Sequence, residues 1–296
     1  MLISAGNSGL GAATVKFLAQ HNPAKIYLCA RPASVPSAEA LVASIRVTLP
    51  DINLQILTLN LASLASVAAC AAVVLRATPR LDLLVLNAGI STTAPALTTD
   101  GYESQFGVNH IGHARLAQLL LPVLLRTAAQ GHDVRVLFTS SVAAHTAAPE
   151  NGLALGWMRE ADALDSAYER YAHSKLANAL FARALARRYP TLRCVTVDPG
   201  QVRTALFRKA TGLSAWVRVL VAPVFMWLTG VSAEKGAENG LWAAVSEKAI
   251  SGSFYEPVGV LANKKGRIAD EKLAEELWEW TTKELAQAGG SGWPSS

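Results

Sequence analysis

Cysteine is scarce in this 296-residue chain: Cys29, Cys70 and Cys194 lie far apart, and no CxxC pair occurs. An odd, dispersed set argues against a disulfide framework and favours packed thiols in a reducing, cytoplasmic compartment. Charged residues are also few, at 17%, whereas hydrophobic residues make up 51% and the mean hydropathy is +0.26. This composition excludes an intrinsically disordered chain and permits a large buried core.

Runs of basic residues are missing as well. The formal net charge is +5 and the pI is about 9.2, but Lys and Arg are scattered along the sequence. We therefore expect no nucleic-acid partner, because a phosphorylated small molecule fits the positive charge equally well.

No segment has the features of a membrane span or of a signal peptide with a charged start and an apolar run. The most apolar stretch, residues 213–229, contains Arg218 and Pro223 and is shorter than the ~20 apolar residues that a span needs. Its Trp, Phe and Met side chains favour a cover over an apolar ligand. Contact with a membrane surface or with a protein partner is the less favoured alternative.

Short apolar runs alternate with helix-length segments. Strands are expected at residues 1–4, 25–29, 53–59, 82–86, 134–140 and 193–197, and helices at 11–20, 38–47, 64–76, 102–125 and 171–189. The internal runs are apolar on both faces, as in parallel strands that helices cover. This order predicts an α/β fold with a Rossmann-like, doubly wound parallel sheet that binds ligands at the carboxyl ends of its strands. We expect one domain over residues 1–288 and a disordered tail over 289–296, which read GGSGWPSS.

A glycine-rich turn follows the first strand and precedes the first helix. Gly6, Gly9 and Gly11 would let backbone N–H groups approach a pyrophosphate, which the positive end of the helix would favour. The spacing is GxxGxG and not the dinucleotide fingerprint GxGxxG, so the turn alone could be structural. Its placement between strand and helix favours a dinucleotide site.

Arg31 ends the second predicted strand, 20 residues after Gly11, and no Asp or Glu occurs before Glu39. An acid at this point would bind the adenosine ribose of NAD(H), whereas an arginine accommodates the 2′-phosphate of NADP(H). Taken alone, Arg31 could be a solvated strand-end residue. Together with the glycine turn, it favours NADP(H).

Tyr171 and Lys175 are four residues apart, so on a helix they share one face. An ammonium near the phenol is expected to lower the pKa of the tyrosine from its usual value near 10, so that the hydroxyl can exchange a proton. The YxxxK pattern alone is common in helices. Here it follows a strand that ends in Thr139-Ser140-Ser141, whose hydroxyls would point into the ligand crevice.

These motifs resemble, in the same order and over residues 4 to about 285, those of the short-chain dehydrogenase/reductase family, most closely its retinol-dehydrogenase-like and fungal ketoreductase branch of secondary metabolism. The family's TGxxxGxG, NAG, tetrad asparagine, tetrad serine, YxxxK and PGxVxT match Ser4–Gly11, Asn87–Gly89, Asn109, Ser141, Tyr171–Lys175 and Pro199–Thr204. The resemblance implies an oxidoreductase with a helical substrate lid at about residues 205–230.

Catalytic and cofactor roles follow from the resemblance. It implies Asn109, Ser141, Tyr171 and Lys175 as the catalytic residues, with Asn109 holding a water that relays protons to Lys175. It implies cofactor contacts from Gly6, Asn7, Ser8, Gly9, Leu10, Gly11, Arg31, Asn60, Leu61, Asn87, Ala88, Gly89, Tyr171, Lys175, Pro199, Gly200, Val202 and Thr204.

Three positions depart from the family pattern. Ala5 replaces the first glycine of the turn, and its Cβ is expected to shift the backbone slightly. Asn60 stands where the family usually has an aspartate near adenine. Asp198 precedes Pro199-Gly200, where a neutral residue or histidine is common, and places an acid near the nicotinamide.

Several histidines invite other readings, which the sequence does not favour. His110 and His113 have a spacing seen in metal sites, but no ligand set accompanies them, so we expect structural roles and no metal. His173 lies inside the YxxxK motif but off the Tyr171 face, and a bystander role is expected for it.

The sequence therefore predicts an NADP-dependent enzyme that reduces a carbonyl of a bulky hydrophobic ketone to an alcohol, or runs the reverse oxidation. Tyr171 would supply the proton. The substrate pocket is expected from residues 142–170, with Trp157 and Met158, and from residues 213–229. An epimerase or dehydratase on the same cofactor fold, and a catalytically silent NADP(H)-binding regulatory or scaffold protein, stay open as alternatives, as does a homo-oligomer.

Overall fold

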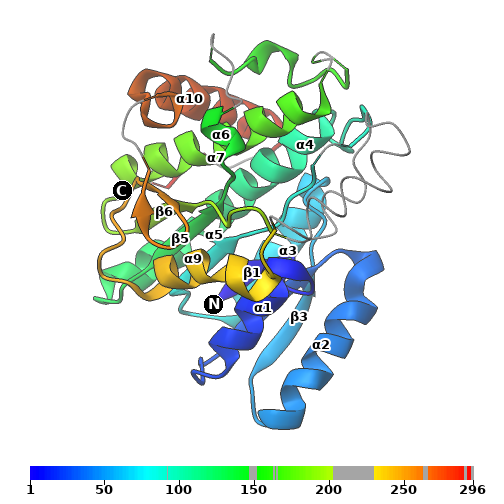
Figure 1. The fold of residues 1–296 in the computed structure, drawn as a ribbon, viewed down its shortest axis with the longest axis vertical. Helices are drawn as coiled ribbons and strands as arrows, with labels where there is room; N and C mark the ends of the chain where they lie inside the picture. Colours follow the sequence, from blue (N-terminus) through cyan, green and yellow to red (C-terminus); the bar gives the residue numbers. More distant parts are fainter. Residues whose placement is uncertain are drawn as a thin grey trace.

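The computed structural model describes residues 1–91, 93–146, 152–162, 164, 166–202, 230–262, 266–289 and 292–294. An eight-stranded sheet forms its centre (Figure 1), in the order β3-β2-β1-β4-β5-β6-β7-β8. The strands are β1 (Leu2–Ser4), β2 (Ile26–Ala30), β3 (Leu54–Thr58), β4 (Leu83–Leu86), β5 (Arg135–Thr139), β6 (Arg193–Val197), β7 (Phe254–Glu256) and β8 (Val260–Leu261). All neighbouring pairs are parallel except β7 and β8, which are antiparallel.

The six strands predicted from the sequence are confirmed to within one residue at each end. Sequence reading missed β7 and β8, because three and two residues are too few to show a pattern. The strand order reverses between β1 and β4, since the chain moves outward through β2 and β3 and then returns to the other side of β1. In such sheets the ligand crevice lies at the carboxyl ends of the strands beside this reversal.

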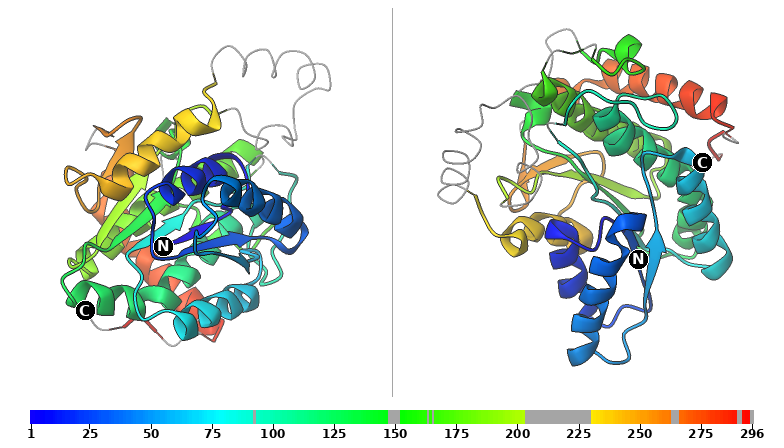
Figure 2. Two further views of the ribbon diagram at one scale, coloured as in Figure 1. Left: turned by 90° about the horizontal axis from the view of Figure 1, so that it is seen from below. Right: turned by 90° about the vertical axis from the view of Figure 1, so that its right-hand side faces the viewer.

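Helices cover both faces of the sheet (Figure 2). One face packs against α1 (Gly9–Ala19), α2 (Val35–Thr48) and α9 (Ala233–Val245), and the other against α3 (Leu64–Ala77), α5 (Gly112–Ala129) and α7 (Ala167–Arg188). A further helix, α10 (Glu271–Gln287), packs on α7. The Rossmann-like, doubly wound α/β fold predicted from the sequence is confirmed. Sequence reading did not include α9 or α10, although Asp270 is an N-cap that accepts from Leu273 N.

The helix predicted over residues 102–125 is broken in the structure. A short helix, α4 (Ser104–Phe106), leads into a π-helical turn over Gly107–Ile111 before α5 begins. Glycines permit this path: a Cβ at Gly107 would lie 2.5 Å from Thr98 Cγ2, and one at Gly112 would lie 2.5 Å from the Leu61 carbonyl oxygen. Single π-turns inside helices often mark functional sites, and this one contains Asn109.

The catalytic-motif helix α7 begins with a side-chain N-cap. Ser166 is the N-cap, and its hydroxyl accepts from Glu169 N at 3.4 Å. The helix is 22 residues long, and its middle part is buried between α4, α10 and the sheet. Burial on several sides fixes where this helix places its side chains.

The C-terminal tail does not match the prediction of disorder at Gly292–Pro294. The Trp293 ring lies 4.4 Å from the Trp278 ring, and its indole Nε1 donates to Thr282 Oγ1 at 2.9 Å. Tyr189 donates to the Pro294 carbonyl at 2.6 Å. A composition-based reading of GGSGWPSS overlooks how much apolar surface one tryptophan can bury.

The three cysteines are buried and unpaired, as expected for packed thiols. Although distant in sequence, Cys29 on β2 and Cys70 on α3 bring their sulfur atoms to 3.9 Å. Among the helices that the structure describes, none combines the length and apolarity needed to cross a membrane.

Candidate active site

A cleft of about 320 Å³ opens at the carboxyl ends of the central strands. It is lined by residues from the glycine turn, the ends of β2, β4 and β5, helix α7 and the segment after β6: Ala5, Ser8, Gly9, Leu10, Arg31, Asn87, Ala88, Gly89, Ile90, Ser91, Thr93, Thr139, Ser140, Tyr171, Lys175 and Pro199. The cleft thus joins the predicted cofactor turn to the predicted catalytic helix.

The glycine turn is built for close backbone approach. A Cβ at Gly11 would lie 2.1 Å from the Ala5 carbonyl oxygen, so only glycine fits there. Gly9 has a φ of +51°, the left-handed region that glycine adopts easily. Ser8 is the N-cap of α1 but makes no side-chain capping bond, so the first N–H groups of the helix stay available to an anion.

Ala5, which replaces the first glycine of the family pattern, also has a φ of +51°. In this left-handed region an L-residue is strained by its Cβ. The shift of the backbone expected from this Cβ stays a prediction.

Ser4 holds the turn against the β4 end. Its buried hydroxyl accepts from the backbone N–H groups of Asn87 and Ala88, both at 2.9 Å, and Asn87 Nδ2 donates to the Ser4 carbonyl at 3.0 Å. The same hydroxyl lies 2.9 Å from His113 Nε2, while His113 Nδ1 lies 2.9 Å from the Asn109 carbonyl oxygen. Because a carbonyl only accepts, Nδ1 carries the proton and Nε2 accepts from Ser4.

Arg31 lies at the rim of the cleft, directly after β2. It is exposed, and no described carboxylate lies within salt-bridge distance of its guanidinium. Asn7 lies nearby in the turn, where its Nδ2 donates to Ser37 Oγ at 2.8 Å. An unpaired guanidinium at this rim can accept an anionic group from a ligand.

Tyr171 and Lys175 line the other end of the cleft, and Ser141, which is not among the lining residues, contacts Tyr171. Tyr171 is hydrogen-bonded to the Ser141 side chain, and Lys175 Nζ lies 5.6 Å from the centre of the Tyr171 ring. Lys175 Nζ donates to the Thr139 carbonyl at 3.0 Å. Ser140 instead donates to the Lys175 carbonyl at 2.7 Å, so it is part of the framework and Ser141 is the serine beside the tyrosine.

The pKa of Tyr171 lies above its usual range in this structure and not below it, as the nearby ammonium alone predicted. Burial raises the pKa of Tyr171 well above its usual range, and the hydrogen bond from Ser141 opposes that rise. Burial also lowers the pKa of Lys175 to about 8, and the charge of Asp198 opposes that fall. Desolvation dominates because both side chains are almost fully buried, at 6% and 3% exposure.

Asn109 connects the cleft floor to the catalytic helix. Its Oδ1 accepts from Ile90 N at 2.8 Å, and its Nδ2 donates to the Ile90 carbonyl and to Ser174 Oγ, both at 2.9 Å. A Cβ at Gly89 would lie 3.3 Å from Lys175 Nζ, so the absence of a side chain at Gly89 leaves room for the ammonium. The side chain of Asn109 thus fixes the loop after β4, and its predicted water relay to Lys175 stays a prediction.

The remaining predicted cofactor residues fall into two groups. Pro199 lines the cleft, whereas Asn60 lies outside the residues that line it, and its Oδ1 accepts from Ala62 N at 3.1 Å. Six other predicted cofactor residues are also not among those that line the cleft: Gly6, Asn7, Gly11, Leu61, Gly200 and Val202. Thr204 and the proposed lid at 205–230, apart from Gly230, lie outside the described residues.

The side chains of Trp157 and Met158, predicted to form part of the substrate pocket within residues 142–170, do not reach the cleft. Met158 is buried in the main core and its carbonyl accepts from Glu103 N at 2.8 Å, so it is a packing residue. Trp157 lines a separate small cavity with Arg170 and His173. Neither Trp157 nor Met158 is among the residues that line the cleft, which corrects that part of the prediction.

Sequence reading missed two polar cleft residues, Ser91 and Thr93. Ser91 is buried, lines the cleft, and its Oγ has no hydrogen-bond partner among the described residues. Thr93 lines the same cleft, as does Thr139, which the sequence had placed at the crevice. The position of Ser91 and Thr93 in the sequence could have identified them, because hydroxyl side chains that follow the carboxyl ends of parallel strands face the ligand crevice.

The other histidines support the fold. His110 Nε2 lies 3.0 Å from Thr281 Oγ1, and burial lowers the pKa of both His110 and His113 to about 3. His173 Nδ1 lies 3.0 Å from the Glu169 carbonyl oxygen. Among the described residues, no group of His, Cys, Asp and Glu is arranged to hold a metal ion.

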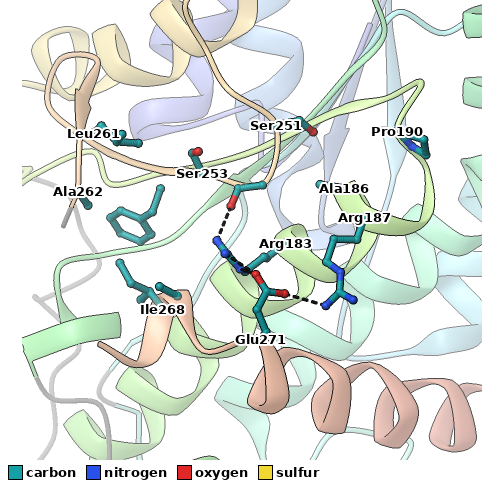
Figure 3. A pocket seen from close by; sticks show the side chains of 13 residues that line it. Arg183, Ala186, Arg187, Pro190, Ser251, Ser253, Leu261, Ala262, Ile268 and Glu271 are labelled. Carbon is teal, nitrogen blue, oxygen red and sulfur yellow. Dashed lines mark hydrogen bonds and ion pairs between the residues drawn. The ribbon is translucent and has the colours of Figure 1, made fainter. Parts of the chain in front are cut away.

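A second hollow, of about 410 Å³, lies away from the cleft between the end of α7, β7 and the start of α10 (Figure 3). Its charged groups are paired with each other: Glu271 accepts from Arg187 at 2.7 Å and also pairs with Arg183. Arg183 additionally donates to the Gly252 carbonyl at 3.4 Å. Because the charged residues that line this hollow pair with each other, the cleft with Tyr171 is the candidate active site.

Comparisons with known proteins show the family of this chain. A family described as short chain dehydrogenase matches residues 1–153. The chain is 33% identical to the short chain dehydrogenase/reductase dpchH of Colletotrichum higginsianum, covering 97% of this chain and 75% of that protein. It is also 33% identical to human retinol dehydrogenase 13, covering 94% and 82%.

Among solved structures, the NADPH-bound carbonyl reductase from chicken fatty liver shares the fold, with a TM-score of 0.62 and 24% identity over 88% of this chain and 96% of that one. The sheet, the glycine turn and the Ser141–Tyr171–Lys175 cluster therefore belong to a member of the short-chain dehydrogenase/reductase family, in its retinol-dehydrogenase-like branch, with the family's nucleotide-binding oxidoreductase fold.

Proposed function

We propose that this protein is an NADPH-dependent reductase that converts a carbonyl of a bulky hydrophobic substrate to an alcohol, or runs the reverse oxidation. The observation that carries the proposal is one cleft lined by Arg31 at its rim and by Tyr171 and Lys175 at its other end, with the Ser141 side chain hydrogen-bonded to Tyr171. The first feature suits a phosphorylated dinucleotide and the second suits proton transfer to a carbonyl oxygen.

The residues present fit the dinucleotide. The N-terminus of α1 leaves its first N–H groups without a side-chain cap and so suits the pyrophosphate. Arg31 suits the 2′-phosphate, and the buried, unpartnered Ser91 hydroxyl is a polar group on the cleft wall that a ligand can satisfy. NADPH in the structure of the chicken carbonyl reductase supports the same choice.

When bound, the nicotinamide supplies the hydride. A tyrosine hydroxyl is protonated at neutral pH, and burial keeps the pKa of Tyr171 above its usual range, so Tyr171 can act as the proton donor to the carbonyl oxygen. Ser141, hydrogen-bonded to Tyr171, polarises the same oxygen. Lys175 supplies a positive charge beside the tyrosine, which favours the phenolate that forms when the proton leaves.

Support for a hydrophobic substrate comes from the described residues beside the proton donor. Val142 follows Ser141 and is 38% exposed, and Tyr168 lies one helical turn before Tyr171 and is 43% exposed. The Tyr168 and Tyr171 ring centres are 6.4 Å apart. Exposed apolar and aromatic surface at a catalytic group favours an apolar substrate over a sugar or small keto acid.

A catalytically silent NADP(H)-binding protein is the second candidate function. It would keep the cleft but would have no need for the Ser141–Tyr171 hydrogen bond, which argues against it. The test is NADPH consumption at 340 nm with a panel of ketones that range from small and polar to polycyclic and long-chain. We expect turnover that favours the bulky apolar ketones, and binding of NADPH with no turnover of any ketone would support the silent protein instead.

A further inference from the structure

A buried arginine stands directly before the proposed proton donor. Arg170 precedes Tyr171 on α7 and is 3% exposed. Its Nη1 donates to the Leu164 carbonyl at 2.6 Å, and its Nη2 donates to the Thr93 carbonyl at 3.0 Å. Its Nε lies 3.4 Å from Glu103 Oε1. One guanidinium therefore contacts three separate segments of the chain.

The segment that contains Thr93 is part of the cleft itself. Thr93 and Tyr171 both line the cleft, although they come from different elements, the loop after β4 and helix α7. Thr93 Oγ1 also lies 3.4 Å from the hydroxyl of Ser104, the first residue of α4. Because Arg170 bonds to the backbone of Thr93, its guanidinium links this wall of the cleft to the helical turn that carries the proton donor.

Glu103 holds the remaining side of the guanidinium. It is 3% exposed, its Oε2 accepts from Phe106 N at 2.7 Å, and its own N–H donates to the Met158 carbonyl at 2.8 Å. Burial raises the pKa of Glu103, and the hydrogen bond from Phe106 N and the charge of Arg170 oppose that rise. The two bonds from Arg170 to neutral carbonyls do not depend on the charge of Glu103.

We propose that Arg170 is a positioning residue that fixes the Thr93 wall of the cleft relative to Tyr171 and thereby sets the selectivity for bulky ketones. This inference rests on the proposed function, in which a bulky apolar ketone reaches Tyr171. Such a ketone must pack against several lining residues at once, whereas a small ketone makes fewer of these contacts. Displacement of the wall by ~1 Å should therefore affect the bulky ketone more than the small one.

Arg135 provides a matched control in another part of the fold. It is 4% exposed, and its Nη1 donates to the carbonyls of Ala243 and Ser246 at 2.9 and 2.8 Å. The same guanidinium pairs with Asp133. Arg135 begins β5, whereas the cleft residue Thr139 ends it, so this arginine lies at the opposite end of the strand from the cleft. Both arginines thus bond to two carbonyls and one acid, but only Arg170 is bonded to a wall of the cleft.

The first measurement is amide hydrogen exchange by mass spectrometry on Arg170→Lys and Arg135→Lys. Lysine keeps the positive charge but lacks the planar fork that reaches two carbonyls at once. In Arg170→Lys we expect faster exchange than in the unmodified protein in peptides that cover residues 93–104 and 155–162. In Arg135→Lys the faster exchange should instead appear in peptides that cover residues 243–246, since those carbonyls lose their donor.

The second measurement is steady-state kinetics with saturating NADPH and with one bulky and one small apolar ketone. In Arg170→Lys the KM for the bulky ketone should rise about tenfold, or ~1.4 kcal/mol, which is about the contribution of one hydrogen bond. The KM for the small ketone and the Kd for NADPH should stay within about twofold, and kcat within about threefold, because Ser141, Tyr171 and Lys175 are retained. Arg135→Lys should lose a similar amount of stability in urea titration and leave both KM values unchanged.

Glu103→Gln/Arg170→Met is the second variant if the lysine variant does not fold. It removes both charges, so no unpaired ion stays buried, and it should give the same changes in exchange and in KM. Unchanged exchange over residues 93–104 in a folded variant would overturn the inference. An equal rise in KM for both ketones, or an equal rise in Arg135→Lys, would also overturn it. Hydrogen exchange needs no turnover, so a protein that reduces no ketone would contradict the proposed function, while exchange would still decide whether Arg170 fixes the wall.

Discussion

Arg31→Ala provides a sharp test of cofactor choice. Arg31 is exposed at the cleft rim, and no described carboxylate pairs with it, so the substitution removes a ligand contact without breaking a bond that the fold uses. Charge-assisted hydrogen bonds contribute ~1.5–3 kcal/mol, and solvent screening at an exposed rim places this one near the lower part of that range. A loss of ~2 kcal/mol corresponds to a rise of about 30-fold in the Kd for NADPH.

The dissociation constants of NADPH and NADH are measured by fluorescence titration for both proteins. We expect the Kd for NADPH to rise about 30-fold and the Kd for NADH to stay within about twofold, because NADH has no 2′-phosphate for Arg31 to contact. Arg80→Ala is the matched control: it removes an equal charge from an exposed arginine that pairs with Asp82. Arg80 precedes the amino end of β4, whereas the cleft residues Asn87, Ala88 and Gly89 follow its carboxyl end. Equal losses for both cofactors, or an equal loss in the control, would refute the role of Arg31.

Three further substitutions or conditions test the fold around the site. Ala5→Gly should raise the free energy of unfolding by ~0.5 kcal/mol, measured by urea titration. The variant loses the strain of an alanine at positive φ, and this gain exceeds the cost of the greater backbone entropy of glycine in the unfolded chain. A destabilised variant would contradict the strain argument. Trp293→Ala should cost ~2 kcal/mol of stability and leave kcat unchanged, since Trp293 packs on Trp278; an unchanged urea midpoint would show that the tail contributes nothing. His110 and His113 bind protons near pH 6.5 in the unfolded chain but only near pH 3 in the folded protein. The free energy of unfolding should therefore fall as the pH drops below about 6.5, by up to ~1.4 kcal/mol per pH unit for each histidine. Urea midpoints that stay constant between about pH 7.5 and pH 5 would contradict this.

Much of the fold could be predicted from the sequence because its signals are local. Buried parallel strands are short apolar runs, and the glycine turn has its own spacing, so six strands and the order of the motifs could be read directly. The break of the predicted 102–125 helix into α4, a π-turn and α5 could not be, because it depends on Gly107 and Gly112 meeting Thr98 and Leu61 in three dimensions.

In the candidate site, too, some features could be predicted from the sequence and others depend on three-dimensional packing. Helix periodicity places Tyr171 and Lys175 on one face, and the resemblance to the family selects Ser141 at the end of the strand; the structure brings the three together. The direction of the Tyr171 pKa could not be predicted, because it depends on burial outweighing the nearby charge. Likewise, the use of Ser4 and His113 to fix the loop after β4 involves partners that are 83 and 109 residues apart from Ser4.

The central claim is that Tyr171 is the proton donor of a reductase, and Tyr171→Phe tests it most directly. The phenyl ring fills the same buried space, so the Kd for NADPH should stay within about twofold of the original protein. Turnover of the best apolar ketone, followed at 340 nm, should fall by about 100-fold or more, because the carbonyl oxygen loses its acid. A Tyr171→Phe protein that binds NADPH and reduces the ketone at the original rate would contradict the account.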